Sequence, residues 1–551
     1  MRRRSDPEAL PVTEPAGAAP HYSDLWQGIA RSDPERIAVI TREGTVTWAQ
    51  LAAEAGALAR HLSQRGLGVG DAAAMLLYNR PEYLAFTWAC LAIGVSPVAI
   101  NYRYRAGEVR DLLVDSRTPV LLASTSLGGI ARDAIEGAGF AVELITVADD
   151  DTVVPGATRY EDILPAGGSL PAAAPRGAEM RLYTGGTTGM PKAVVWDLDT
   201  LLIARRRSTW GLLGIEPPET LADAVRIAVD PATPRVVTLP LTPLLHGTAQ
   251  SMTMGTMALG GTVVLHAAPR MDIDEAVRLT REHQVTRLIV AGDALALPFA
   301  DAVERSGEGL PHVDSILSSG MRFSDDVKRR LHRLGDLAIV DILASSEGGP
   351  FAFGITRSVA DLPARLELTP ETVLLAEDLT EIPQDPGALG ILAFRGILPK
   401  GYFGDPKKTA ETFPAIRGHR YVMPGDWARA RGDGTVELLG RLSAVVNTGG
   451  EKVFPAEVEE ALLSHPDIDD AIVFGLPDER FGEVVSAMVA PVPGRRVDVT
   501  ELHAHLDARL AGYKKPRHVF VRESLGRGST GKVELARVKE DALRELAEVT
   551  R

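Results

Sequence analysis

Short apolar runs alternate with longer amphipathic segments between residues 37 and 123. Residues 37–40, 72–78, 96–100 and 119–123 are apolar runs of the length that strands have. Between them, residues 81–92 and 106–115 have the length and pattern of helices, and Thr47 is placed to cap a helix that begins at residue 48. Strands that alternate with helices in this way predict parallel sheets joined by crossover helices.

The same kinds of segment return near the C-terminus in a smaller set. Residues 471–474 and 483–489 are typical of strands, and residues 500–510 are typical of a helix. We therefore expect a second, smaller layer of strands and helices after the large N-terminal region.

Composition and charge narrow the class of protein. A chain of 551 residues is long enough for several hydrophobic cores. The formal net charge of −14 argues against general nucleic-acid binding. The single cysteine, Cys90, fits a reducing compartment. The longest apolar segment, residues 84–100, is interrupted by Gly94, Ser96 and Pro97, so we expect a core segment, no integral membrane association and a cytoplasmic protein.

The most informative stretch is residues 182–192, Leu-Tyr-Thr-Gly-Gly-Thr-Thr-Gly-Met-Pro-Lys. Its glycines allow positive φ and close approach to a ligand, and successive free N–H groups form an anion-binding concavity. Threonine hydroxyls and the Lys192 ammonium add donors. The stretch therefore predicts a polyphosphate-binding loop between two strands. It differs from a Walker loop, because Pro191 precedes Lys192 where that motif has glycine. A plain Gly/Thr-rich hairpin is the alternative.

This stretch resembles the phosphate loop of the adenylate-forming superfamily, which includes acyl- and aryl-CoA synthetases, peptide-synthetase adenylation domains and beetle luciferase. The usual family form is Ser/Thr-Ser-Gly-Thr-Thr-Gly-x-Pro-Lys, and Gly185 replaces a serine here. The resemblance covers residues 22–540 and six elements in the family's order. It implies that the phosphate loop holds the β- and γ-phosphates of ATP. The residues concerned are Thr184, Gly185, Gly186, Thr187, Thr188, Gly189 and Lys192.

Two segments resemble the family's metal and adenine elements. Residues 339–347 form a strand-like run that ends in Ser346 and Glu347, similar to the family's Tyr-Gly-x-Thr-Glu, although Leu343 stands where the aromatic residue is usual. The resemblance implies that Ser346 contacts phosphate and Glu347 binds Mg²⁺, a hard cation that takes one or two carboxylates plus phosphate oxygens. Gly320 and Met321 lie where the family has a turn beside the adenine.

The remaining elements concern ribose, coenzyme A and the acyl group. Asp426 and Arg441 match the ribose-binding positions. Gly449 and Gly450 would line the tunnel for the coenzyme A thiol. His246 would lie at the acyl pocket. Lys532 fills the position of the lysine that contacts the reacting carboxylate and the α-phosphate. The resemblance thus implies Lys532, Glu347, Thr187 and His246 as the catalytic group.

The implied fold is α/β with an α+β C-terminal domain, in which a large N-terminal domain of layered sheets and crossover helices precedes a small mobile domain. We expect a disordered tail over residues 1–20, an adenylation core over 21–441, a hinge at 442–443 and a mobile domain over 444–551. The implied activity is that of an ATP-dependent, AMP-forming acyl-CoA synthetase that uses ATP, Mg²⁺, coenzyme A and a carboxylic acid. A homodimer is a common family arrangement.

Other functions are left open by the sequence. Gly526 and Gly531-Lys532 have Walker spacing, but Val533 stands where that motif needs Ser or Thr, which disfavours a P-loop kinase or ATPase. A stand-alone enzyme that loads a carrier protein is the alternative within the family. The basic residues Arg509, Lys514, Lys515 and Arg517 could meet coenzyme A phosphates or form an ordinary solvated face.

The acyl group is indicated by resemblance alone. The segments at 420–426 and 447–455 are most similar to those of actinobacterial ligases of steroid-derived acids. They also resemble the synthetases of platensimycin and platencin biosynthesis, antibiotic pathways whose substrates are diterpenoid acids. We expect a bulky polycyclic acid, with medium-chain fatty acids and aryl acids as alternatives.

Overall fold

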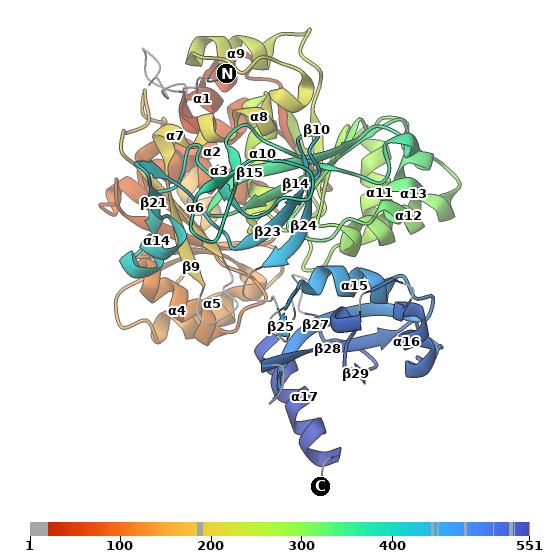
Figure 1. The fold of residues 1–551 in the computed structure, drawn as a ribbon. Helices are drawn as coiled ribbons and strands as arrows, with labels where there is room; N and C mark the ends of the chain where they lie inside the picture. The colour runs from red at the N-terminus through yellow and green to blue at the C-terminus, as the bar shows by residue number, and fades with distance from the viewer. Residues whose placement is uncertain are drawn as a thin grey trace. The chain divides into compact units, whose positions relative to one another are not determined.

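A computed structural model describes residues 20–184, 191–441, 446–448, 451–478, 482–507, 509–510, 512–527, 533 and 535–549. Within that part of the chain there are two compact units. The first comprises the chain up to Leu182 together with Val195–Ile289, and the second comprises Tyr183–Val194 and the chain from Val290 onward. Figure 1 shows the helices and strands of both.

The first unit contains the predicted parallel sheet. Its strands are β3 (Ala72–Leu76), β4 (Ser96–Ala99), β5 (Val120–Ser124), β6 (Glu143–Val147) and β7 (Thr158–Arg159). They lie in the order β4-β3-β5-β6-β7, and every neighbouring pair is parallel. Strands buried on both faces read as continuous apolar runs, which explains the uniform burial of β3 and β5. The prediction of a parallel sheet with crossover helices is confirmed.

Helices of the first unit surround this sheet and a second, mostly parallel strand set. The helices are α1 (Tyr22–Ser32), α2 (Trp48–Gln64), α3 (Pro81–Ile93), α4 (Ala106–Ser116), α5 (Gly128–Glu136), α6 (Tyr160–Ile163), α7 (Leu198–Ala204), α8 (Arg206–Thr209), α9 (Leu221–Val229), α10 (Gly247–Ala258) and α11 (Ile273–Glu282). The second strand set is β12 (Arg287–Val290), β10 (Val237–Pro240), β11 (Thr262–Val264), β1 (Ile37–Thr41) and β2 (Gly44–Thr47), in that spatial order. Only β2 runs antiparallel to its neighbour.

Indole rings tie the first three helices together. Trp26 of α1 meets Trp88 of α3 edge to face at 5.8 Å, and Trp88 meets Trp48 of α2 at 5.9 Å. All three side chains are buried. Thr47 caps α2 as predicted, because its hydroxyl accepts the Gln50 N–H at 3.2 Å and the Gln50 side chain accepts the Thr47 N–H in return. The start of α2 is therefore determined by residues next to it in sequence. The burial of Trp48 on α2 depends instead on Trp88, which is distant in sequence.

The sheet of the second unit is antiparallel except for one parallel pair at its β13 end. Its strands run in the order β18 (Glu381–Ile382), β17 (Thr372–Leu375), β19 (Leu389–Phe394), β23 (Asp426–Ala430), β24 (Thr435–Arg441), β16 (Leu366–Leu368), β15 (Gly348–Thr356), β14 (Ala338–Ser345) and β13 (Ser315–Ser319). The associated helices are α12 (Asp293–Ser306), α13 (Asp325–Leu334) and α14 (Pro406–Thr412). Strands β13 and β14 are parallel, and β14 turns into β15 as a hairpin. A short antiparallel pair, β21 (Ala415–Ile416) and β22 (His419–Arg420), stands apart.

A three-stranded sheet carries the ends of the predicted phosphate loop. It consists of β20 (Gly401–Tyr402), β9 (Lys192–Asp197) and β8 (Glu179–Thr184), in that order. The sequence predicts a loop between two strands at this place, and the described residues on either side of it are indeed strands.

The C-terminal part of the second unit is a sheet between helices. Its elements are β25 (Val446–Thr448), β26 (Glu451–Val453), α15 (Pro455–Leu463), β27 (Ile468–Asp478), β28 (Gly482–Pro491), α16 (Val499–Asp507), β29 (His518–Val521) and α17 (Leu535–Val549). Figure 1 shows α15 and α16 on one face of the β27–β28 hairpin and α17 on the other. Val485 and Val489 pack toward α15 and α16, while Val484 and Met488 pack toward α17. The helix predicted over 500–510 ends at Asp507.

Candidate active site

The predicted site residues fall into three groups. Gly185, Gly186, Thr187, Thr188, Gly189, Gly449, Gly450 and Lys532 lie outside the described residues, as does the predicted hinge at 442–443. Thr184, Lys192, Gly320, Met321, Ser346, Glu347, Asp426 and the backbone of Arg441 are described and belong to the second unit. His246 belongs to the first unit.

Strands β8 and β9 fix both ends of the predicted phosphate loop. Thr184 is the last residue of β8, and its hydroxyl donates a long hydrogen bond of 3.5 Å to the carbonyl of Lys192 at the start of β9. On its other side β9 pairs with β20, and the Phe403 N–H donates to the Ala193 carbonyl at 2.9 Å. The backbone at Lys192 is therefore held from two sides.

Lys192 forms an ion pair with Asp405. Its Nζ donates to Asp405 Oδ2, while Asp405 Oδ1 accepts the Lys408 N–H at 2.9 Å and caps α14. The hydrogen bond from Lys192, followed by the one from the Lys408 backbone, lowers the pKa of Asp405 below its usual value. The Lys192 side chain is 47 % exposed, so its ammonium is accessible to an anion.

Ser346 and Glu347 form the tip of the β14–β15 hairpin. Ser345 pairs with Gly348, so these two residues are the turn between the strands. Glu347 Oε1 accepts a hydrogen bond of 2.8 Å from the hydroxyl of Tyr402. Tyr402 is in β20, three residues before the aspartate that pairs with Lys192. A carboxylate held through one oxygen still offers lone pairs on the other, so Glu347 fits Mg²⁺, which takes one or two carboxylates together with phosphate oxygens.

The parallel pair β13–β14 places Gly320 and Met321 at the same sheet edge as this turn. Ser319 at the end of β13 pairs with Ile342 of β14, so both strands finish at their carboxyl ends there. Gly320 has φ +82°, in the left-handed region that favours glycine. A Cβ on this residue would meet no atom within 4 Å, so the backbone face is open to a ligand. Ligand sites of α/β sheets lie at this edge.

Gly292 and Asp293 support the Gly320–Met321 turn, and sequence reasoning did not find them. The Asp293 N–H donates to the Arg322 carbonyl at 2.9 Å, and its carboxylate accepts the Ser324 N–H at 2.9 Å. Gly292 has φ +52°, and its N–H donates to the Ser318 hydroxyl at 3.0 Å. A signal existed, because a Gly-Asp pair between a strand and a helix is typical of a tight turn followed by a helix start.

The two predicted ribose residues are opposite each other on neighbouring strands. Asp426 begins β23 and Arg441 ends β24, and these two residues are paired in the antiparallel register. Gly425, just before Asp426, has φ +90°. Residues paired directly across antiparallel strands have Cα atoms roughly 4.5–5.5 Å apart, which suits joint recognition of one sugar.

His246 precedes α10 in the first unit. Its N–H donates to the Pro243 carbonyl at 3.0 Å, and its carbonyl accepts the Gln250 N–H at 3.0 Å. Of the methionines that follow, Met254 and Met257 are buried in the core, and Met252 is half-buried. Met254 and Met257 thus pack in the core, where flexible methionine side chains fill irregular apolar space.

The basic residues near the C-terminus have acidic partners within their own part of the chain. Lys514 pairs with Glu457 at 2.6 Å, Arg517 pairs with Asp478 at 3.3 Å, and Lys515 pairs with Asp507. Arg527 makes a two-pronged contact with Asp470 through Nε and Nη2, both at 2.7 Å. Ion pairs of this kind favour a solvated charged face over a preformed phosphate site for Lys514, Lys515 and Arg517.

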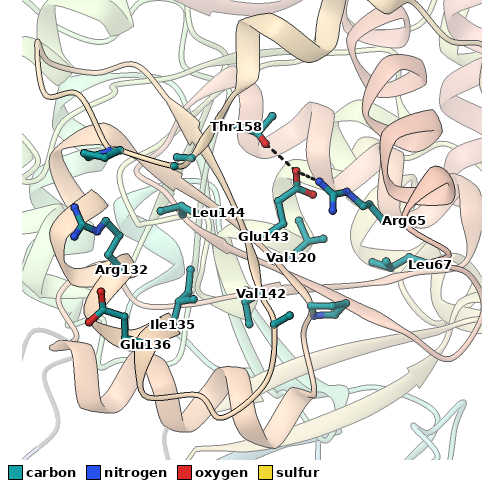
Figure 2. Close-up of a pocket in the computed structure, with 15 residues that line it drawn as sticks. Arg65, Leu67, Val120, Arg132, Ile135, Glu136, Val142, Glu143, Leu144 and Thr158 are labelled. Atoms are coloured by element: carbon teal, nitrogen blue, oxygen red, sulfur yellow. Dashed lines mark hydrogen bonds and ion pairs between the residues drawn. The ribbon is translucent and has the colours of Figure 1, made fainter.

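A cavity of about 570 Å³ lies elsewhere in the first unit. Figure 2 shows it at the amino ends of β5, β6 and β7, with Arg132 and Glu136 on one side and Arg65 and Glu143 on the other. Glu143 already accepts from Arg65 at 2.6 Å, from Thr158 at 2.8 Å and from the His61 ring at 3.0 Å. The cavity contains none of the predicted site residues and lies at the amino edge of a parallel sheet, opposite the edge where such folds bind ligands.

Comparisons with known proteins agree with the fold. The family described as AMP-binding enzyme matches residues 26–403, and the AMP-binding enzyme C-terminal domain matches residues 457–532. A medium/long-chain-fatty-acid–CoA/3-oxocholest-4-en-26-oate–CoA ligase of Mycobacterium tuberculosis is 34% identical over 533 residues, covering 94% of this chain and 96% of the relative. A 3-oxocholest-4-en-26-oate–CoA ligase of Rhodococcus rhodochrous is 34% identical over 532 residues, covering 93% and 94%.

Solved structures match over nearly the whole chain. An anthranilate CoA ligase in complex with anthranoyl-AMP superposes with a TM-score of 0.78 at 19% identity, covering 96% of this chain and 98% of that one. An o-succinylbenzoate CoA synthetase of Bacillus subtilis in complex with its acyl-adenylate gives 0.75 at 23% identity, covering 94% and 98%.

The fold and the sequence matches together define an adenylate-forming enzyme with a large N-terminal and a small C-terminal domain, and the chain belongs to the AMP-binding enzyme family. It is an AMP-forming acid–thiol ligase, which joins a carboxylic acid to coenzyme A through an acyl-adenylate. ATP and coenzyme A are the substrates of such ligases, and Mg²⁺ is their usual ion. In the described residues, no helix is long and apolar enough to cross a membrane.

Proposed function

We propose that the acid activated by this ligase is a bulky, hydrophobic polycyclic carboxylic acid of the steroid or diterpenoid type. The observation that carries this proposal is the similarity, over 93% and 94% of the chain, to two ligases named for a cholestane-derived acid. The carboxylate oxygen attacks the α-phosphorus of ATP and pyrophosphate leaves. The thiol sulfur of coenzyme A then attacks the acyl carbonyl carbon, and AMP leaves.

The phosphate end of ATP is assigned to residues of the second unit. Thr184, Thr187, Thr188 and Lys192, with the loop glycines between them, would hold the β- and γ-phosphates, and Ser346 would donate to a phosphate oxygen. Glu347 would hold Mg²⁺, which neutralises charge on the phosphate oxygens as pyrophosphate departs. Lys532 would contact the α-phosphate and the reacting carboxylate. Cations and donors fixed at these points stabilise the charge that develops in the transition state.

The nucleoside and the acyl chain are assigned by position. Asp426 and Arg441 would recognise the ribose, which fits their directly paired places on β23 and β24. Gly320 and Met321 would border the adenine through their backbone. His246 would line the acyl pocket. The second half-reaction would follow rotation of residues 444–551 about a hinge at 442–443, after which the thiol would approach along Gly449 and Gly450.

A fatty acid is the second candidate for the acyl group, because the Mycobacterium tuberculosis relative is also named for medium and long-chain fatty acids.

Pyrophosphate release with ATP and Mg²⁺ tests the proposal. The panel contains a steroid acid, a diterpenoid acid, a medium-chain fatty acid and an aryl acid, each with and without coenzyme A. We expect release that depends on a polycyclic acid, and an acyl-CoA of the matching mass once coenzyme A is present. A preference for the linear acid would overturn the substrate proposal.

A further inference from the structure

One short segment, residues 401–409, contacts both the candidate metal ligand and the candidate phosphate cation. It comprises β20, the turn after it and the first part of α14, and we call it the 401–409 segment. The Tyr402 hydroxyl donates to Glu347 Oε1 at 2.8 Å. Asp405 Oδ2 accepts from Lys192 Nζ. Glu347 follows a strand of one sheet and Lys192 begins a strand of another, and the 401–409 segment connects the two residues.

The backbone of the 401–409 segment is held in place by its own hydrogen bonds. The Thr409 hydroxyl accepts the Tyr402 N–H at 2.9 Å and donates to the Asp405 carbonyl at 2.7 Å. The Lys408 N–H donates to Asp405 Oδ1 at 2.9 Å. Pairing of β20 with β9 adds the Phe403 bond to Ala193. Tyr402 and Asp405 therefore project from a fixed turn rather than from a loose loop.

Gly401 is needed where this turn begins. Its φ is +147°, and a Cβ there would overlap the Thr409 side chain. The Tyr402 ring packs against Phe413 at 6.0 Å between centroids, which fixes the direction of its hydroxyl. A donor fixed in this way restricts the orientations open to the Glu347 carboxylate and leaves Oε2 for a cation.

The ion pair with Asp405 can hold the Lys192 ammonium in position and still leave it able to bind a phosphate. The two side chains are 31 % and 47 % exposed, so the pair contributes little to stability in water. Such a partner fixes where the ammonium stands while the lysine remains able to donate further hydrogen bonds, since an ammonium has three donors.

We propose that Tyr402 and Asp405 are positioning residues for adenylation: Tyr402 orients Glu347 toward the metal, and Asp405 sets the place of the Lys192 ammonium. The inference rests on the proposed roles of Glu347 and Lys192. Removing a group that hydrogen-bonds to a metal ligand typically lowers metal affinity or activity by roughly 10–100-fold.

Tyr402→Phe tests the first half of the proposal. We expect the Mg²⁺ concentration for half-maximal pyrophosphate release to rise by roughly tenfold, and excess Mg²⁺ to restore kcat. Calorimetry of ATP binding with Mg²⁺ and with EDTA supplies a readout that needs no turnover, and the gain in affinity from Mg²⁺ should shrink. Tyr160→Phe is the matched control, because Tyr160 donates to Glu54 at the same 2.8 Å in the first unit.

Asp405→Asn tests the second half. Asparagine keeps the cap of α14, so the change removes the charge and leaves the fold. We expect kcat for adenylation to fall by roughly tenfold while the Kd for ATP does not rise, because less negative charge faces the triphosphate. Asp272→Asn is the control, since Asp272 caps α11 through the Glu275 N–H at 3.1 Å.

Each outcome decides the inference. If Tyr402→Phe keeps the wild-type rate and needs the same Mg²⁺ concentration for half-maximal pyrophosphate release, the role of Tyr402 is overturned. A higher kcat in Asp405→Asn would overturn the role of Asp405, because it would show that Asp405 competes with the phosphates for Lys192. If either variant has a lower melting temperature together with a higher Kd for ATP, its residue has only a structural role and the proposal fails for that residue. Failure of the wild type to release pyrophosphate with any acid would instead refute the proposed substrate class, and the calorimetric comparison would still test the segment.

Discussion

Single buried charges in the second unit are matched to a partner. Lys328 of α13 is 3 % exposed, and its Nζ donates to Asp341 Oδ2 on β14 at 3.1 Å. Burial raises the pKa of Asp341 above its usual value, and the attraction of Lys328 acts in the opposite direction. Lys328 also lies over the Phe323 ring at 5.1 Å. Removing the ammonium would leave a desolvated carboxylate without a counter-charge.

Lys328→Met should therefore lower the free energy of unfolding by roughly 3 kcal/mol at pH 7. Because the folded-state pKa of Asp341 is raised, the protonated carboxyl is the form that the fold favours. Ionisation of Asp341 therefore lowers the free energy of unfolding as pH rises through that pKa. The loss should accordingly be smaller at pH 5 than at pH 7. Chemical unfolding at both pH values measures it, and the double variant with Asp341→Leu should recover most of the loss. An equal deficit at the two pH values would contradict this account.

At the scale of elements, helix α2 depends on an approach that only glycine permits. A Cβ on Gly56 would overlap the Gly168 carbonyl oxygen, and a Cβ on Gly168 would overlap that of Gly56. Both atoms belong to backbone, so neither can rotate away. The loop after α6 thus passes directly across the helix at Gly56.

Gly56→Ala should destabilise the protein by roughly 2 kcal/mol, because overpacking outweighs the gain of about 1 kcal/mol in helix propensity. Thermal unfolding measures the sign. Gly107→Ala in α4 is the control, since a Cβ there meets nothing within 4 Å, and it should be neutral or stabilise by about 0.5 kcal/mol. A stabilised Gly56→Ala protein would show that the loop yields.

A second element-scale feature anchors the segment that leads to Lys532. Arg527 binds Asp470 with two bonds of 2.7 Å and also donates to the Ala471 carbonyl at 3.2 Å. The hydrogen bonds to Asp470 raise the pKa of Arg527. Two parallel bonds fix direction as well as distance, so Arg527 is held at a defined place beside β27.

Asp470→Asn should slow acyl-adenylate formation by roughly tenfold, since misplacing a catalytic group by a small distance is costly. Thioester formation from a preformed acyl-adenylate should be unchanged, because that step does not use Lys532 in the proposed scheme. Rapid-quench assays separate the two rates. Asp467→Asn, which weakens the Arg495 ion pair of 2.7 Å in the same part of the chain, is the control. Equal slowing of both half-reactions would argue against an anchoring role.

At the scale of the whole molecule, the proposed function requires two half-reactions with different needs to use one chain. The proposed scheme separates them by rotation at 442–443. Proline fixes φ near −65°, so it restricts a hinge without changing either domain.

Ser443→Pro should leave pyrophosphate release within about twofold of wild type and slow acyl-CoA formation by at least about tenfold, equal to roughly 1.4 kcal/mol in the barrier. Steady-state assays with and without coenzyme A measure the two outputs. Leu442→Ala is the control, because it changes a side chain at the same place without restricting the backbone. Normal thioester formation in Ser443→Pro would move the proposed hinge elsewhere.

Much of the fold was predictable because its determinants are local. The alternation of residues 72–123 encoded the parallel sheet, and Thr47 with Gln50 encoded the start of α2. The strand-like run predicted over 339–347 is β14 as far as Ser345, and Ser346 and Glu347 follow as the turn. The contacts of Glu347 were not predictable, since Tyr402 comes far later in the chain and tyrosine has no spacing rule that links it to a carboxylate.

The sequence by itself determined the order of the elements, the position of the phosphate loop between two strands and the family, because each depends on short runs of residues read in order. The tertiary structure alone decided which distant residues meet: Lys192 with Asp405, Glu347 with Tyr402, and Asp293 with the backbone at Arg322. The physical reason is that hydrogen bonds and ion pairs act over about 3 Å, and only folding brings segments so distant in sequence to that range.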